Sequence, residues 1–265
     1  MNFRNIILDA EPECYSGLDY DFIDKFSYNT WFICNYLSLQ IRKLHVPTDG
    51  EYNTFFCEIT KRECSVKKEP VACLVAPNPC LNVHLHLEET ELAKYLEMCD
   101  ETERFEFYLS LLERAYRLSV AQGRDIPIDI LLKLHQEFRE NGYRNERLFK
   151  KKQLRDYGVK IELHHVLTSY SYNLILSIYD LHNQLINKGS IYETYPYDIF
   201  FNKTVRHLVF EDGKMIVTDF LDHPQFVCNL EDMSKGIIHS VCMDEHTRKY
   251  IPNANNQSDF DRLKW

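Results

Sequence analysis

The sequence predicts an α+β protein with antiparallel strands near both ends of the chain, a central group of helices, and segregated layers of the two. Two patterns carry this prediction. Apolar residues alternate along short segments within 52–87 and again in the last third, whereas between 92 and 138 they recur every three or four positions. With 45% hydrophobic residues among 265, the chain can bury a sizeable core.

The first predicted element is a helix over residues 21–44. Phe22, Phe26, Ile33, Leu37 and Ile41 fall at helical spacing, and further aromatic residues widen the apolar surface well beyond one stripe. A helix that is apolar over most of its girth is buried. Because aromatic residues also favour strands, a strand pair is the alternative.

Residues 52–87 predict a small antiparallel sheet. Phe55, Cys57 and Ile59 alternate with their neighbours, and further strands are expected at 71–76 and 81–87. Two prolines, at 77 and 79, mark the turn between the last two strands, because proline cannot donate to a strand ladder.

Three helices are expected next, over residues 92–99, 103–120 and 127–141. Each places its apolar residues on one face. Asp100 and Glu103 are suited to cap the second helix, and Gly123 and Gly142 stand where the second and third helices end.

The last third is expected to hold strands and one helix. Residues 159–164 alternate as a half-buried strand, and 174–185 fit a helix capped by 187–189, with a strand as the alternative. Residues 204–210 and 215–220 flank Asp212-Gly213, which predicts a β-hairpin. Further strands are expected at 226–230 and 236–241.

The chain is expected to form a single domain over residues 1–265. A subdivision, if present, is expected near 123–142, where two glycines follow predicted helices. We favour one domain because nothing there resembles a flexible linker.

Glycine is scarce, with eight residues, none clustered. Phosphate-cradling loops need clustered glycines, so the P-loop and the dinucleotide fingerprint are absent and no cofactor is expected. The Gly-x-Ser-x-Gly and His-Glu-x-x-His motifs are also missing.

The formal charge of −9 disfavours a general affinity for nucleic acid and would attract a basic protein partner. Solubility alone is the competing explanation. One part of this acidic chain is locally basic, the stretch between Arg139 and Arg155, which we interpret as a solvated face.

The nine cysteines form no Cys-x-x-Cys pair. No membrane span is expected, because no run of about 18 apolar residues occurs. The apolar run at the N-terminus is too short for a secretory signal. Together these features predict a cytoplasmic protein with reduced thiols.

His84 and His86 are the candidate metal ligands. Residues two apart on a strand face the same way, so both imidazoles can meet one ion, with Cys73 and Cys80 nearby in sequence. We favour the simpler interpretation, an exposed polar face of the strand opposite Val83, Leu85 and Leu87, and we predict no metal.

The C-terminal part gathers acids, histidines and a thiol, enough for general acid–base chemistry. Cys242 with His239 or His246 is a candidate nucleophile pair, whereas 222–224 fit a turn equally well. The set consists of Asp219, Asp222, His223, His239, Cys242, Glu245 and His246.

Seventeen tyrosines are many for this length, and tyrosine suits interfaces because its ring can be buried while its hydroxyl stays paired. Two tyrosine groups lie among polar residues: Tyr170, Tyr172 and Tyr179, and Tyr192, Tyr195 and Tyr197.

These observations favour a non-enzymatic, cytoplasmic protein-binding protein. One specific instance is an immunity or antitoxin-type inhibitor that neutralises a basic toxin through an acidic, tyrosine-rich surface. The alternative is a metal-dependent hydrolase that uses His84 and His86, or the C-terminal set of acids and histidines.

Overall fold

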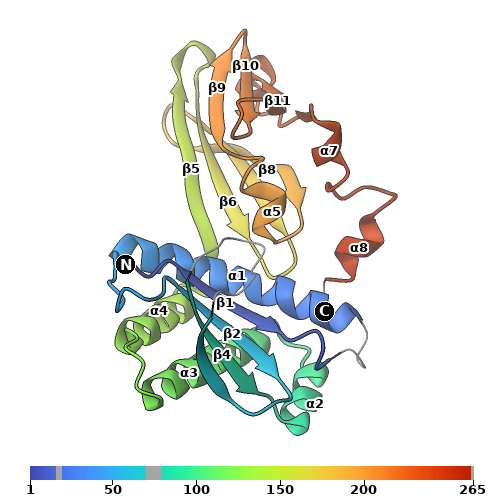
Figure 1. Cartoon of the computed structure of the whole chain (residues 1–265). Helices are drawn as coiled ribbons and strands as arrows, with labels where there is room; N and C mark the ends of the chain where they lie inside the picture. The colour runs from blue at the N-terminus through green and yellow to red at the C-terminus, as the bar shows by residue number, and fades with distance from the viewer. Residues whose placement is uncertain (16–19, 70–78, 264–265) are drawn as a thin grey trace. The chain divides into compact units, whose positions relative to one another are not determined.

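The computed structural model describes residues 1–15, 20–69 and 79–263 (Figure 1). The strand expected at 71–76 and Cys73 lie outside this part of the chain. The chain divides into two compact units, Met1–Arg144 and a second that begins at Asn145. The division lies two residues beyond the stretch 123–142, and each unit is described by itself.

The first unit contains a four-stranded sheet in the order β1-β2-β4-β3. β1, β2 and β4 run parallel and only β3 is antiparallel, so the antiparallel arrangement expected for 52–87 is corrected. The sequence did not predict β1, because its apolar residues form a short run without alternation. The strands are β1 (Asn5–Ala10), β2 (Thr54–Thr60), β3 (Ser65–Glu69) and β4 (Cys80–His86).

The helix expected over 21–44 is confirmed as α1 (Tyr20–Leu44). It follows the edge of the sheet, where the Ser38 Oγ accepts a hydrogen bond from the Ile6 amide at 2.9 Å and the Thr30 hydroxyl donates to the Leu8 carbonyl at 2.7 Å. Helix side chains thereby satisfy backbone groups of the edge strand β1, which would otherwise attract another strand.

The three central helices are also confirmed, as α2 (Glu89–Glu97), α3 (Glu101–Ala121) and α4 (Ile128–Glu140). Figure 1 shows α3 behind the sheet, and α4 packs on α3 and α1, with the His135 ring 5.5 Å from Tyr116 and the Phe138 ring 4.4 Å from Tyr36. The Phe55 ring of β2 lies 4.9 Å from the Tyr116 ring of α3, so one face of the sheet forms a core with α3.

The second unit begins with a four-stranded antiparallel meander. Its strands are β5 (Asn145–Leu154), β6 (Val159–Leu167), β7 (Tyr172–Asp180) and β8 (Leu185–Thr194), with the short 3-10 helix η1 (Arg155–Tyr157) after β5. The helix expected over 174–185 is wrong, because this segment forms β7 and the start of β8. Leu174, Leu176 and Ile178 are fully buried, so the two-residue period decided the structure.

A second antiparallel sheet follows in the order β12-β11-β10-β9. The Asp-Gly hairpin is confirmed: Asp212 and Gly213 have φ of 47° and 71°, as a two-residue type I′ turn requires. The elements are α5 (Asp198–Phe201), β9 (His207–Glu211), β10 (Lys214–Thr218), β11 (Pro224–Asn229), α6 (Leu230–Ser234), β12 (Ser240–Cys242), α7 (Glu245–Arg248) and α8 (Gln257–Asp261).

The α+β class is confirmed, with strands near both ends and helices between them. In the second unit the two sheets contact each other through aromatic and cationic side chains. The Tyr192 ring of β8 stacks on Phe226 of β11 at 4.5 Å, and the Lys152 ammonium of β5 lies 5.2 Å from the Phe210 ring of β9.

Candidate functional site

Negative charge is concentrated in the first unit. It holds 16 basic and 24 acidic residues, a net −8, against 15 and 16 in the second, a net −1. Residues 88–103 account for −6, with one lysine and seven carboxylates. We call this stretch the acidic segment; its carboxylates are Glu88, Glu89, Glu91, Glu97, Asp100, Glu101 and Glu103.

The acidic segment forms α2 and the first turn of α3. Six of its seven acids are exposed, and the half-buried Glu91 pairs with Arg114 at 2.7 Å. Glu88 and Glu91 form a capping box at the start of α2, and the Asp100 carboxylate accepts a hydrogen bond from the Glu103 amide at 3.0 Å. Helix N-termini stabilise such acids, so the caps explain part of the charge.

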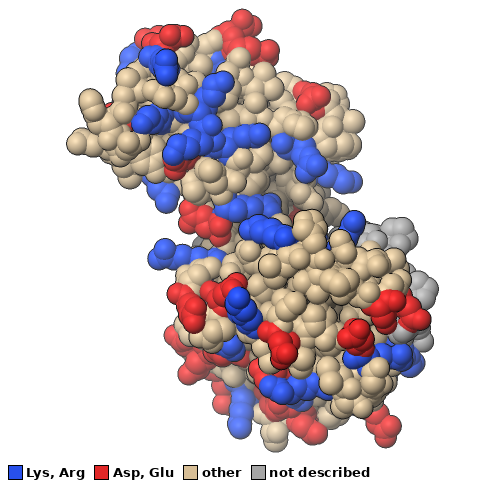
Figure 2. All heavy atoms as spheres, turned by 90° about the vertical axis from the view of Figure 1, so that its left-hand side faces the viewer, with Lys and Arg blue, Asp and Glu red and all other residues tan. Residues whose placement is uncertain are grey.

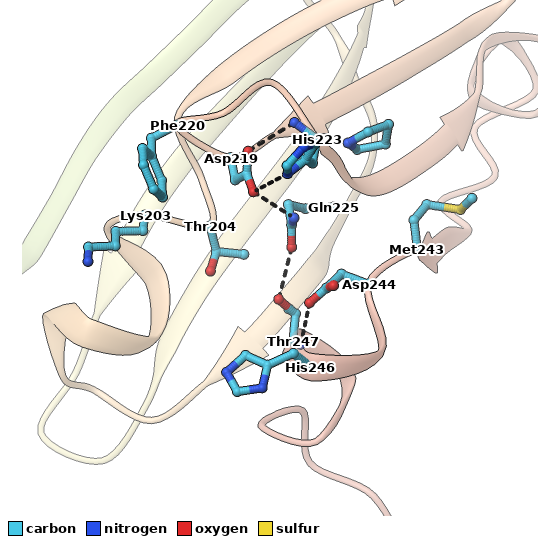
Figure 3. A pocket seen from close by; sticks show the side chains of 11 residues that line it. Lys203, Thr204, Asp219, Phe220, His223, Gln225, Met243, Asp244, His246 and Thr247 are labelled. Carbon is cyan, nitrogen blue, oxygen red and sulfur yellow. Dashed lines mark hydrogen bonds and ion pairs between the residues drawn. The ribbon is translucent and has the colours of Figure 1, made fainter.

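Three members of the C-terminal set meet at an open cavity of about 340 Å³ in the second unit (Figure 3). Asp219, His223 and His246 line it. So do Gln225 and Thr247, which sequence reasoning did not select. The cavity lies between the turn after β10 and the start of α7, two segments that the sequence alone could not place side by side.

Hydrogen bonds hold the carboxylates of this cavity in structural roles. The Asp219 Oδ1 accepts from the amides of Leu221 and His223, at 2.8 and 2.9 Å. Its Oδ2 accepts a hydrogen bond from the side-chain Nε2 of Gln225 at 3.3 Å. The Oε1 of the same Gln225 side chain accepts a hydrogen bond from the Thr247 hydroxyl at 2.9 Å. Asp219 therefore shapes the turn and ties it to α7.

Asp244 caps α7 by accepting a hydrogen bond from the Thr247 amide at 2.6 Å. That bond to the charged form is the main reason that the pKa of Asp244 lies below its usual range. Both acids of this cavity thus serve the backbone of their own loops.

The rest of the C-terminal set lies elsewhere. Asp222 is exposed in a turn with φ of 63°, and His239 and Glu245 are exposed. Cys242 lines a different cavity, of about 240 Å³, and burial raises the pKa of its thiol. A nucleophilic cysteine needs the opposite shift, so this environment does not activate Cys242.

His84 and His86 lie on one face of β4, as expected, but turn to different partners. The His84 Nδ1 lies 3.8 Å from the Glu58 Oε2, whereas the His86 Nδ1 lies 3.1 Å from the Arg62 carbonyl oxygen. Over residues 1–15, 20–69 and 79–263, no three or more His, Cys, Asp or Glu side chains are grouped so as to hold a metal ion.

Sequence reasoning missed the acids around His84. Strand register places Asp9 of β1 beside Glu58 of β2, and Glu58 beside His84 of β4. Glu11, after β1, pairs at 2.9 Å with Arg62, after β2. We call these five residues the strand-end cluster, because they lie toward the carboxyl ends of the parallel strands, where open α/β sheets bind ligands.

The strand-end cluster has unusual electrostatics. Burial, then the negative charges of Glu11 and Asp9, raise the pKa of Glu58 to about 7, and burial also raises that of Asp9. Burial opposes ionisation of Glu11, but hydrogen bonds from Cys14 and Thr60 and the charge of Arg62 hold its pKa below the usual range. Glu58 therefore changes charge near neutrality.

The tyrosines lie mainly inside the protein. Every tyrosine side chain that the structure describes is buried or half-buried. Within the two groups selected from the sequence, Tyr172 and Tyr192 are 0% and 2% exposed. The other four, Tyr170, Tyr179, Tyr195 and Tyr197, are half-buried and keep part of their side chains at the surface.

The basic stretch between Arg139 and Arg155 lies mostly on a strand at the edge of a sheet. Arg139 forms a forked ion pair with Glu106, and Lys151 pairs with Glu162 at 2.5 Å. Most of the stretch forms the edge strand β5, over which lysine and arginine side chains gather on the face shown in Figure 2. Lysines on an edge strand oppose unwanted pairing with other chains.

Neither a membrane-spanning helix nor a disulfide is found within the described residues. In the described part, no helix has the length and apolar character needed to cross a bilayer. Eight cysteines are free thiols within the same residues.

Comparison of the chain with protein-family models, with curated proteins and with solved structures found no match.

Proposed function

We propose that the protein binds a basic partner protein through the acidic segment. The concentration of charge carries the proposal: sixteen consecutive residues supply −6 of the −8 of the first unit. Solubility alone would be served as well by acids spread over the surface.

Caps explain only part of this charge. Glu88, Glu91 and Asp100 stabilise helix starts, whereas Glu97 stands in the last turn of α2, the end of a helix at which a carboxylate is unfavourable. Exposed carboxylates this close repel one another within the Debye length of about 10 Å at 0.1 M salt. A cationic partner would relieve that repulsion, so binding should be fast and salt-sensitive.

The acidic segment also offers an apolar contact. The Leu96 side chain in α2 is 44% exposed among the carboxylates. Interfaces commonly combine a small apolar anchor with a charged rim, the anchor supporting affinity and the rim supporting specificity and rate.

The specific instance that we propose is an immunity or antitoxin-type inhibitor of a basic toxin. Proteins that act on nucleic acid need basic surfaces. An acidic segment that covers such a surface would compete directly with the phosphates.

The test reverses charge at two matched places. One variant carries Glu89→Lys, Glu97→Lys and Glu103→Lys in the acidic segment, and the control carries three reversals in the second unit: Asp156→Lys, Glu211→Lys and Glu245→Lys. All six acids are exposed. Tagged chains capture proteins from lysate of the native source at about 50 and 500 mM salt, and captured proteins are identified by mass.

The expected result is one basic protein at equal stoichiometry, released at high salt, lost with the first variant and retained with the control. Capture that the control weakens as much as the first variant would contradict the proposal. So would the absence of a stoichiometric partner, or a partner indifferent to both salt and charge reversal.

A further inference from the structure

The strand-end cluster adjoins the acidic segment through His86, whose Nδ1 lies 3.1 Å from the Arg62 carbonyl oxygen and whose Nε2 lies 3.5 Å from the Glu88 carboxylate, but the cluster has a different composition. The row across the sheet, Asp9, Glu58 and His84, occupies the face opposite to Phe55, which packs on α3. Glu58 and His84 each keep 18% of the side chain exposed, so solvent reaches both. The charge of Arg62 is already shared by Glu11 and Glu13, at 2.9 and 3.0 Å.

Two buried polar atoms beside the cluster have no hydrogen-bond partner among the described residues. One is the Oδ1 of Asn82, a side chain 7% exposed on the same face of β4 as His84, two residues before it. The other is the hydroxyl of Tyr15, 1% exposed in the loop after β1 that also contains Glu11. An unsatisfied buried acceptor is destabilising, and a hydrogen bond donated by a ligand would remove that cost.

We propose that the strand-end cluster binds a small organic cation that donates N–H hydrogen bonds, an amine or a guanidine. Glu58 and the Asn82 Oδ1 accept these bonds, and the surrounding carboxylates balance the positive charge. A cation of this class satisfies the buried acceptor and relieves the crowding of negative charge in one step.

Binding should release protons near neutral pH. Glu58 faces the charges of Glu11, Asp9, Glu13 and Arg62, and the imidazole of His84; on α1, Asp24 adds to the negative field at Asp9. Burial and the acidic neighbours keep Glu58 partly protonated at pH 7. A bound cation favours the carboxylate, so its proton leaves to solvent.

The experiment is isothermal titration of the full chain with agmatine, which carries one guanidinium and one amine. Titrations are made at pH 7 in low-salt phosphate and in HEPES, because the difference in heat gives the protons released. We expect one agmatine per chain, release of a fraction of one proton, and binding at least tenfold weaker in both Glu58→Gln and Asn82→Leu. The matched control Glu140→Gln removes one exposed carboxylate of the first unit outside both the strand-end cluster and the acidic segment, and should bind normally.

Two results would overturn the inference. One is no heat of binding with agmatine at up to about 10 mM; the other is equal weakening in Glu58→Gln and Glu140→Gln, which would mean attraction to net charge only. Circular dichroism of each variant confirms folding, and Glu58→Gln alone decides the outcome if Asn82→Leu fails to fold.

Discussion

The two units each bring acids and histidines together, but they treat the acids in opposite ways. In the second unit, Asp219 and Asp244 accept hydrogen bonds from backbone amides of their own turn and helix start. In the first unit, burial and like charge disfavour ionisation of Glu58 within its strand, and at Asp9 burial outweighs the hydrogen bonds from the Ser27 hydroxyl and the Ala10 amide. Similar residue types therefore give structural acids in one unit and a titratable site in the other.

The difference shows that backbone context decides the role of an acid. A turn or a helix start supplies amide donors that point at the carboxylate, and these stabilise its charge. The interior of a strand uses most of its amides in the ladder, so a buried carboxylate such as that of Glu58 must find other partners or a proton. Acids inside strands are the better candidates for chemistry.

The largest expected effect is a gain of stability in Glu58→Gln at pH 8. A raised folded pKa means that the folded chain holds a proton which the unfolded chain has lost, so the free energy of unfolding falls as pH rises from about 4.5 to 7. Glutamine removes this cost. We expect a gain of about 2 kcal/mol, or about 5 °C in the midpoint of the first unit.

Thermal unfolding followed by circular dichroism at pH 8 and pH 5 measures this gain. At pH 5 Glu58 is mostly protonated in the folded chain, so the gain in stability should shrink to a small fraction of its value at pH 8. Equal midpoints of wild type and variant at pH 8 would show that Glu58 is ordinary, and the contrast between the units would fail.

A smaller effect of opposite sign is expected from Asp244→Ala. The variant loses the cap of α7 and should destabilise the second unit by about 1 kcal/mol at pH 7. The pKa of Asp244 is lower in the folded chain than in the unfolded chain. The stabilisation is therefore fully present above the pKa of the unfolded state and disappears as pH falls through the pKa of the folded state. Urea unfolding at pH 7 and pH 2.5 checks both statements; a loss that persists at pH 2.5 would point to packing.

The smallest effect is expected from Glu103→Gln in the acidic segment. The carboxylate lies in the first turn of α3, where its interaction with the helix dipole stabilises the fold by about 0.5 kcal/mol at low salt. Repulsion from the neighbouring carboxylates offsets part of this stabilisation. Urea unfolding at low and high salt should show a change of at most a few tenths of a kcal/mol. A loss above about 1 kcal/mol would mean that the acidic segment is structural and would weaken the binding proposal.

Sequence patterns predicted the elements with strong local signals. The helices from α1 to α4 and the β9–β10 hairpin follow from periodicity, capping residues and turn chemistry. The segment that forms β7 fits two periods. Leu174, Ile178 and Leu181 match a helix, whereas Leu174, Leu176 and Ile178 match a strand. Burial of the second set in the sheet decided in favour of the strand. The parallel pairing of β1 with β2 depends on long-range contacts that local pattern does not contain.

The sites were predictable only in part. Asp219, His223 and His246 were selected by residue type and do meet, but their hydrogen bonds depend on Gln225 and Thr247. The strand-end cluster had a readable signal that was missed. Asp9 and Glu58 each interrupt a run of apolar residues within a strand, and a charge in that position must be explained by a partner or a function.

The most direct test of the contrast between the units is carbon-detected NMR titration of side-chain carboxyl groups from pH 3 to 9. We predict that Glu58 titrates near pH 7 and Asp244 below the usual range of an aspartate. If both groups titrate at ordinary values, backbone context does not separate the acids of the two units and the account is wrong.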